Sequence, residues 1–112
     1  MLTVEENQEV CILTIEALRF DSAVGTLIRN AVMSRLDTSS RFVLDMSKVK
    51  LVDSGGLGSL VVILKNVAGN QAELCLAGMQ KPVRLMFELS RMDRQFNLFD
   101  DVASACEALK KA

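Results

Sequence analysis

The sequence predicts an α/β domain built on a mostly parallel β-sheet, and three observations support this class. Half of the 112 residues are apolar and 24% are charged, which is typical of a soluble globular chain. The length suits a single domain, residues 1–112. Short apolar runs alternate with segments of helical periodicity, which gives the order ββαβαβαβα, with an N-terminal hairpin and about four helices.

The first elements are expected to be a hairpin and a helix. Strands over Leu2–Glu6 and Glu9–Glu16 are separated by a turn at residues 7–8, and the second strand is apolar on both faces, as expected of an interior strand. Apolar residues then recur at helical spacing from Ser22 to about Leu36. The first amides of this helix can be capped by either of the polar residues at 21 and 22.

A buried strand and a second helix follow. A polar turn over residues 37–40 leads to a strand at Phe42–Leu44, and a short loop containing Val52 then precedes a helix that opens at Ser54. Apolar residues of this helix fall within one broad stripe that is expected to face the sheet. The stripe comprises Leu57, Leu60, Val61, Leu64, Val67 and Ala68.

The C-terminal third predicts two further strands and two helices. A strand covers Glu73–Ala77, and Pro82 then lies in the first turn of a helix that ends near Leu89. A short strand at Phe96–Phe99 and a terminal helix at Val102–Lys110 complete the chain. Because ligands of parallel sheets bind at the carboxyl ends of the strands, we expect the site at such an end.

The composition excludes several classes of function. Thirteen Lys and Arg against fourteen Asp and Glu give a net charge of −1, so nucleic acid is not an expected partner. The chain contains no His, which excludes Ser-His-Asp and Cys-His nucleophiles and His-based metal sites. We therefore expect neither an enzyme nor a bound cofactor or metal.

The cysteines and the lengths of the hydrophobic runs indicate the cellular compartment in which the protein is expected. Cys11, Cys75 and Cys106 are widely spaced among apolar neighbours, which is typical of buried thiols in a reducing environment. The longest strongly apolar run is far shorter than the roughly 20 residues of a membrane span, and no secretory signal is recognisable. A cytoplasmic location without direct membrane insertion is expected.

One segment combines acidic, hydroxyl and glycine residues at a strand-to-helix turn: Asp53-Ser54-Gly55-Gly56-Leu57-Gly58. Unpaired amides at the start of a helix favour an anion or an anionic modification, so a phosphate on Ser54 would fit there. The plainer interpretation is that Ser54 is an N-cap and that the glycines serve the turn. The spacing matches neither GxGxxG nor GxxxxGK[ST], which argues against nucleotide binding.

This segment and its flanks resemble the STAS domain of bacterial anti-sigma factor antagonists. The resemblance covers nearly the whole chain, and the order Asp-Ser-small-Gly-Leu-Gly is its most specific part. It rests on Phe42–Ser47, Val49, Leu51–Gly58, Glu73–Gly78 and Pro82–Phe96.

The resemblance implies a STAS-like fold and a role for three residues. Ser54 matches the phosphoacceptor of the family, and Asp53 matches the acidic residue beside it. Asp21 lines up with a loop residue near the same partner surface. The residue usually found before that Asp is Gly, which is absent here, and Gly55 stands where Ser or Thr is frequent, so Ser54 is the sole hydroxyl of the motif.

A docking surface is expected beside Ser54. Val62 projects opposite the buried stripe of the second helix, with Ile63 at the margin, which gives a small uncharged patch. Phosphorylation would add about −1.5 to −2 charges next to this patch and oppose docking. The expected partner-binding residues are Asp21, Asp53, Ser54, Gly55, Gly56, Gly58, Ser59 and Val62.

The resemblance implies a switch protein that is a substrate, not an enzyme. Unphosphorylated, it would bind an anti-sigma factor serine kinase with a histidine-kinase-like ATPase fold and release the sigma factor or another output. Phosphorylation at Ser54 would inactivate it, and a serine phosphatase would restore it. The free chain is expected to be a monomer.

The alternative is a constitutive STAS subunit of a transporter or signalling assembly that is not phosphorylated. A small-ligand or nucleotide-binding enzyme is disfavoured, since catalytic bases and a Walker Lys are missing.

Overall fold

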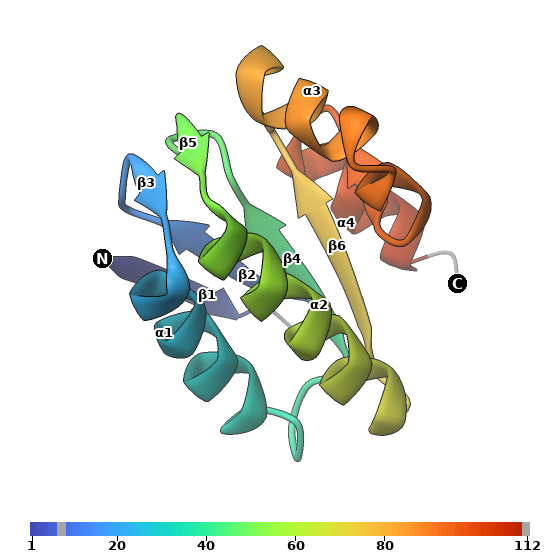
Figure 1. Cartoon of the computed structure of the whole chain (residues 1–112). Coiled ribbons are helices and arrows are strands. Elements are labelled where there is room, and N and C mark those ends of the chain that lie inside the picture. Colours follow the sequence, from blue (N-terminus) through green and yellow to red (C-terminus); the bar gives the residue numbers. More distant parts are fainter. Residues whose placement is uncertain (7–8, 111–112) are drawn as a thin grey trace.

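The computed structural model describes residues 1–6 and 9–110, and its centre is a five-stranded mixed sheet. The strand order is β1-β2-β4-β6-β7, in which β1 and β2 are antiparallel and every later pair is parallel (Figure 1). The predicted hairpin and parallel sheet are therefore confirmed. The strands are β1 Leu2–Glu6, β2 Cys11–Ile15, β4 Arg41–Asp45, β6 Glu73–Ala77 and β7 Asn97–Phe99.

Helices cover both faces of this sheet. Three of them contribute buried residues to the larger core on one face, and the fourth packs on the opposite face against β4 and β6. Figure 1 shows α1 and α2 side by side in front of the sheet, with α4 behind it. The helices are α1 Ser22–Met33, α2 Ser54–Gly69, α3 Lys81–Leu89 and α4 Val102–Lys110, with a 3₁₀ turn η1 at Met92–Arg94.

Two short strands lie outside the main sheet and were not expected from the sequence. β3 (Arg19–Phe20) and β5 (Leu51–Val52) pair in parallel and form a separate two-stranded sheet. Each has only two residues, so no alternation of apolar and polar residues could reveal it. This small sheet fixes the positions from which α1 and α2 begin.

Several predicted boundaries need correction. The second strand begins at Cys11 rather than Glu9, the first helix ends at Met33 rather than Leu36, and the fifth strand begins at Asn97. The predicted turn at residues 7–8 lies outside the described residues. The second strand is interior, as predicted, although β4 occupies the middle of the sheet.

The buried face of α2 also differs from the prediction. The buried residues are Gly56, Leu60, Ile63 and Val67, so Ile63 belongs to the core, whereas Ala68 is exposed. Because α2 is apolar around most of its circumference, helical periodicity alone could not determine which side faces the sheet. The helix also packs closely against α1, which sets its rotation.

Candidate functional site

The N-termini of α1 and α2 lie next to each other because β3 and β5 are paired in register. Phe20 is opposite Val52, so the residues that follow, Asp21 and Asp53, occupy equivalent positions. Each is the N-cap of its helix. Asp21 Oδ1 accepts a hydrogen bond from the backbone N of Val24 at 3.0 Å, and Asp53 Oδ1 accepts one from Gly56 N at 2.8 Å.

Ser54 is therefore not the cap of α2. It is the first residue of the helix, and its side chain is exposed. The cap role proposed for it in the plainer interpretation belongs to Asp53. In α1, Ser22 occupies the same first position and is also exposed. The structure thus presents two Asp-Ser pairs at one end of the helical layer.

Glycine residues allow α2 to sit directly on β3. A Cβ at Gly56 would lie 2.3 Å from the carbonyl oxygen of Phe20, which is too close for any side chain. That carbonyl also accepts a hydrogen bond from Asp53 N at 3.2 Å. A Cβ at Gly55 would lie 3.4 Å from Ser22 Cβ, so the first turns of both helices are neighbours. Gly56 is buried and determines how the motif is placed.

A cation stands next to Ser54. Arg19 Nη2 forms an ion pair with Asp53 Oδ2 at 3.2 Å on the protein surface. The hydrogen bond from Gly56 N, followed by that from Arg19, lowers the pKa of the Asp53 carboxyl below its ordinary value. Asp53 is therefore ionised at neutral pH, and the local field at Ser54 combines a carboxylate, a guanidinium and the positive end of the α2 dipole.

The remaining predicted residues lie along α2. Gly58 is exposed and Val62 is 49% exposed, which agrees with the expected patch. Ser59 is only partly exposed, since it faces α1: a Cβ at Gly25 would meet Ser59 Cβ at 2.3 Å. The Ser59 hydroxyl donates a hydrogen bond to the Gly55 carbonyl at 3.0 Å.

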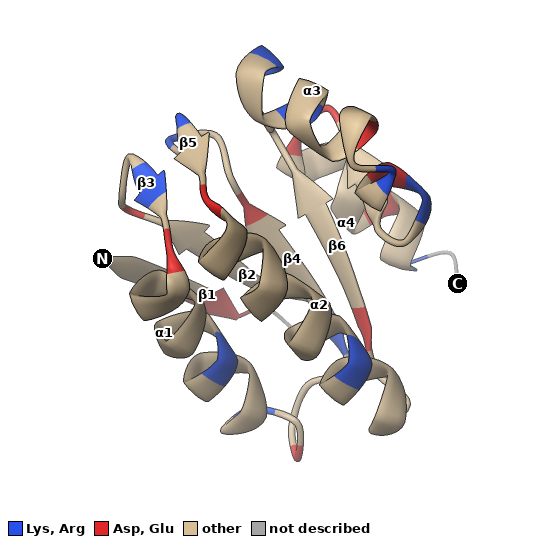
Figure 2. Cartoon of the chain, in the orientation of Figure 1, with Lys and Arg blue, Asp and Glu red and all other residues tan. Residues whose placement is uncertain are grey.

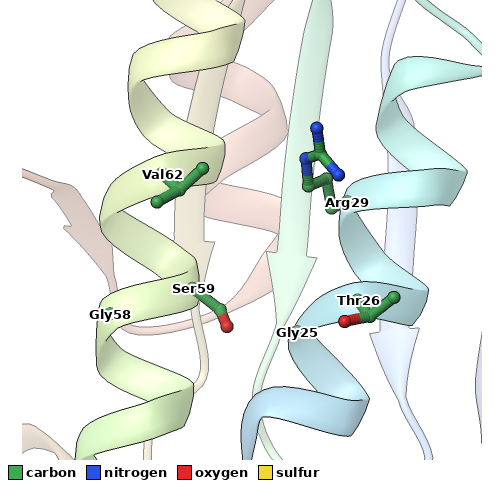
Figure 3. Close-up of a pocket in the computed structure, with 6 residues that line it drawn as sticks. All are labelled: Gly25, Thr26, Arg29, Gly58, Ser59 and Val62. Atoms are coloured by element: carbon green, nitrogen blue, oxygen red, sulfur yellow. The ribbon is translucent and has the colours of Figure 1, made fainter.

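A groove of about 240 Å³ separates the exposed sides of α1 and α2. Figure 3 shows Thr26 and Arg29 on α1 facing Ser59 and Val62 on α2. The α2 side of this groove was predicted from the sequence, whereas the α1 side was not. The repeated Asp-Ser pair at residues 21–22 and 53–54 was a usable signal that both helices begin in the same way. The groove is lined by Gly25, Thr26, Arg29, Gly58, Ser59 and Val62.

The carboxyl ends of the main sheet form a different cavity, of about 400 Å³. Glu16, Lys48 and Gln80 follow β2, β4 and β6 there, together with Leu18. The Ser54 segment does follow a strand, as expected, but that strand is β5 of the small sheet. The predicted site therefore lies beside the carboxyl end of the main sheet rather than on it.

The thiols are poor nucleophiles. Cys11 and Cys75 are buried, and burial raises the pKa of each thiol to about 11. Cys106 is half-buried rather than buried, and desolvation also raises its pKa.

No group of three or more possible metal ligands occurs in the described part of the chain. Among residues 1–6 and 9–110, no helix is long and apolar enough to cross a membrane.

The fold defines a class: a small α/β domain in which a hairpin-led parallel sheet carries two adjacent Asp-capped helices. The family model for the STAS domain matches residues 1–105. The chain therefore belongs to the STAS family.

Known proteins agree with this assignment. A STAS-domain containing protein of Pseudomonas aeruginosa (strain UCBPP-PA14) is 28% identical over 80 residues, which cover 71% of this chain and 79% of that protein. The crystal structure of a candidate anti-sigma factor antagonist from Thermotoga maritima superposes with a TM-score of 0.83 at 22% identity, covering 97% of this chain and 94% of the other.

A protein of the sulfate transporter family from Wolinella succinogenes superposes almost as well. Its TM-score is 0.81 at 18% identity, covering 92% of this chain and 88% of that one. At these identities, both structural likenesses concern the fold. The same fold thus occurs in proteins of two functional kinds.

Proposed function

We propose that this chain is an anti-sigma factor antagonist that works as a phosphorylation-controlled binding switch. In its unphosphorylated form it binds an anti-sigma factor serine kinase with a histidine-kinase-like ATPase fold, which releases the sigma factor or another output. The kinase phosphorylates Ser54 and so ends the interaction. A serine phosphatase removes the phosphate and resets the switch.

The observation that carries this proposal is the exposed hydroxyl of Ser54 at the first position of α2. Exposure lets a kinase reach the Oγ atom. In the transfer, a bond forms between Oγ and the γ-phosphorus of ATP, the bond to ADP breaks, and the hydroxyl proton passes to a base of the kinase. The positive end of the α2 dipole and Arg19 supply positive potential for the resulting phosphate.

The change in charge accounts for switching without a change of fold. A phosphate adds about −1.5 to −2 charges beside the ionised Asp53. A partner that docks closely over this surface must then desolvate the phosphate and meet like charge. A penalty of about 3 kcal/mol would weaken binding roughly 150-fold, which is enough for a usable switch.

Ser22 provides a matched control for the test. It has the same helix position and the same Asp cap type as Ser54. Lysate of the native cells with ATP is expected to phosphorylate the wild type and Ser22→Ala, but not Ser54→Ala, as mapped by mass spectrometry. The kinase should be retained by the wild type, Ser54→Ala and Ser22→Ala, and lost with Ser54→Asp.

The second candidate is a constitutive subunit of a transporter or signalling assembly, which the likeness to a sulfate transporter family protein favours. In that case the exposed end of α2 would be a permanent interface. The same experiment separates the two. If Ser54 is never modified and the wild type, Ser54→Ala and Ser54→Asp all retain the same membrane or scaffold protein, the switch proposal is wrong.

A further inference from the structure

Helices α1 and α2 carry positive charge and no negative charge. Each helix contains a single charged residue, Arg29 in α1 and Lys65 in α2, and both are cations. Figure 2 shows that acidic residues occur at the N-terminal caps and not within these two helices. The ion pairs recorded for residues 1–6 and 9–110 involve other cations, so the Arg29 guanidinium is left available at the groove.

Gly58 has no packing role inside the molecule. Among the described residues, a Cβ at this position would meet no atom within 4 Å other than its chain neighbours and the nearby backbone of α2, whereas a Cβ at Gly25 or Gly56 would collide with an atom at 2.3 Å. Glycine inside a helix weakens that helix relative to alanine. Gly58 is nevertheless in the second turn of α2, where its missing side chain leaves the groove open beside Val62.

The groove and the phosphorylation site share a face of α2. Ser54, Gly58 and Val62 are spaced by four residues, and Lys65 follows three residues later, so all four point to the same side of the helix. All four positions are exposed. This face borders the groove that Arg29 closes from α1.

We propose that the groove between α1 and α2 holds an acidic, partly apolar segment of the kinase that acts on Ser54. A carboxylate of that segment pairs with Arg29, and an apolar side chain lies over Gly58 against Val62. This inference rests on the proposed function and adds the partner's chemistry and the α1 half of the interface. Arg29 gives the groove a positive charge, and Gly25 and Gly58 leave it without large side chains. These two properties complement a negatively charged segment that carries an apolar side chain.

The proposal also explains the sign of the switch. An acidic segment is attracted by Arg29 and Lys65 while Ser54 is unmodified. A phosphoserine on the same face adds negative charge close to that segment, so repulsion replaces attraction. A basic segment would give the opposite result, because phosphorylation would strengthen its binding.

The test uses the full chain and the purified ATPase that phosphorylates Ser54, with dissociation constants from isothermal titration calorimetry. Arg29→Glu is expected to weaken binding at least tenfold. The matched control is Arg94→Glu, which makes the same charge change at an exposed position in η1 and should stay within twofold of the wild type.

A second pair of variants tests the shape of the groove. Gly58→Leu is expected to weaken binding at least tenfold, whereas Gly69→Leu should not, since neither position has a neighbour within 4 Å and only Gly58 lines the groove. The thermal unfolding midpoint of Gly58→Leu itself should not fall below that of the wild type, because Leu favours a helix more than Gly does and no neighbouring element lies near this position; its binding loss then does not come from misfolding.

A photocrosslinking residue at Thr26 then identifies the occupant. The crosslinked segment of the kinase is expected to contain Asp or Glu, and a segment without either overturns the proposal. Less than tenfold weakening in Arg29→Glu or Gly58→Leu also overturns it, while continued phosphorylation of Ser54 leaves the proposed function standing. If no ATPase of the native cells phosphorylates Ser54, both the proposed function and this occupant are wrong.

Discussion

The molecule contains two strand–helix units that begin alike and then diverge. In β3–α1 and in β5–α2, an Asp caps the helix and a Ser follows it, and each cap accepts a hydrogen bond from the backbone N three residues later. The units differ at that third residue, which is Val24 in α1 and Gly56 in α2. Val24 inserts a side chain into the core, whereas Gly56 lets α2 approach the backbone of β3.

The two units share a cap, and the residues around that cap make only the α2 unit a candidate site. In the α2 unit, Gly56 packs against the backbone of Phe20, and the cap residue Asp53 forms an ion pair with Arg19. The glycines of this unit also leave little side-chain bulk around Ser54. The α1 unit keeps an ordinary apolar first turn with Ala23 and Val24. An Asp-Ser pair is therefore insufficient to mark a site, and the glycines that follow provide the access that a partner needs.

The largest effect is expected where the units share a core residue. Phe20 is fully buried and its ring lies beneath both helices, so Phe20→Ala should lower the free energy of unfolding by about 3–5 kcal/mol. Its partner in β5 is smaller, and Val52→Ala should cost about 1–3 kcal/mol. Urea unfolding measures both, and equal costs would show that the two units contribute equally to the core.

Substitutions of the buried glycines should show a clearer difference in stability between the two units. Gly56→Ala is expected to cost about 1–3 kcal/mol or more, because its new Cβ collides with the immovable Phe20 carbonyl. Gly25→Ala also collides, but with the side chain of Ser59.

A second substitution distinguishes the two collisions. In a Gly25→Ala chain, Ser59→Gly removes the colliding Cβ and should restore most of the lost stability, as measured by the urea midpoint. In a Gly56→Ala chain, Ser59→Gly should only destabilise further, since Gly weakens the helix. Rescue of Gly56→Ala would disprove the proposed backbone contact.

The α1 cap should have a moderate effect. Asp21→Ala removes the acceptor of the Val24 N–H and should cost about 1 kcal/mol in thermal unfolding experiments. Asp21→Asn keeps an acceptor oxygen and should cost much less. A loss as large for Asn as for Ala would indicate that the charge, and not the hydrogen bond, stabilises α1.

The smallest effect is a pH dependence at the α2 cap. The folded-state pKa of Asp53 lies below the ordinary value of 3.8, so the ionised carboxylate stabilises the fold above that value. This contribution is lost as the pH falls through the lowered pKa. The stability difference between wild type and Asp53→Asn should therefore be largest near pH 6 and shrink below pH 3.8. A difference that does not change with pH would show that ionisation of Asp53 contributes nothing.

Most of the architecture could be predicted from the amino-acid sequence. Periodic apolar runs and polar punctuation identified the strands of the main sheet and the α-helices found among residues 1–6 and 9–110, because burial of one face leaves a regular pattern in the chain. The Asp53-Ser54 motif was also found, since it combines unusual residues at a helix start. The boundary errors at Leu36 and Glu9 fall at element ends, where propensity gives little information.

The arrangement of these elements into one surface depends on contacts between distant parts of the chain. The pairing of β3 with β5 brings residues 21–22 beside residues 53–54, and two-residue strands leave no pattern for sequence analysis to detect. The burial of Ile63 and the placement of Arg29 on the groove depend on the rotation and contact of α1 and α2. Such contacts join residues about 30 positions apart. The local sequence of either helix is compatible with several rotations about its axis, so packing between the helices determines which rotation is adopted.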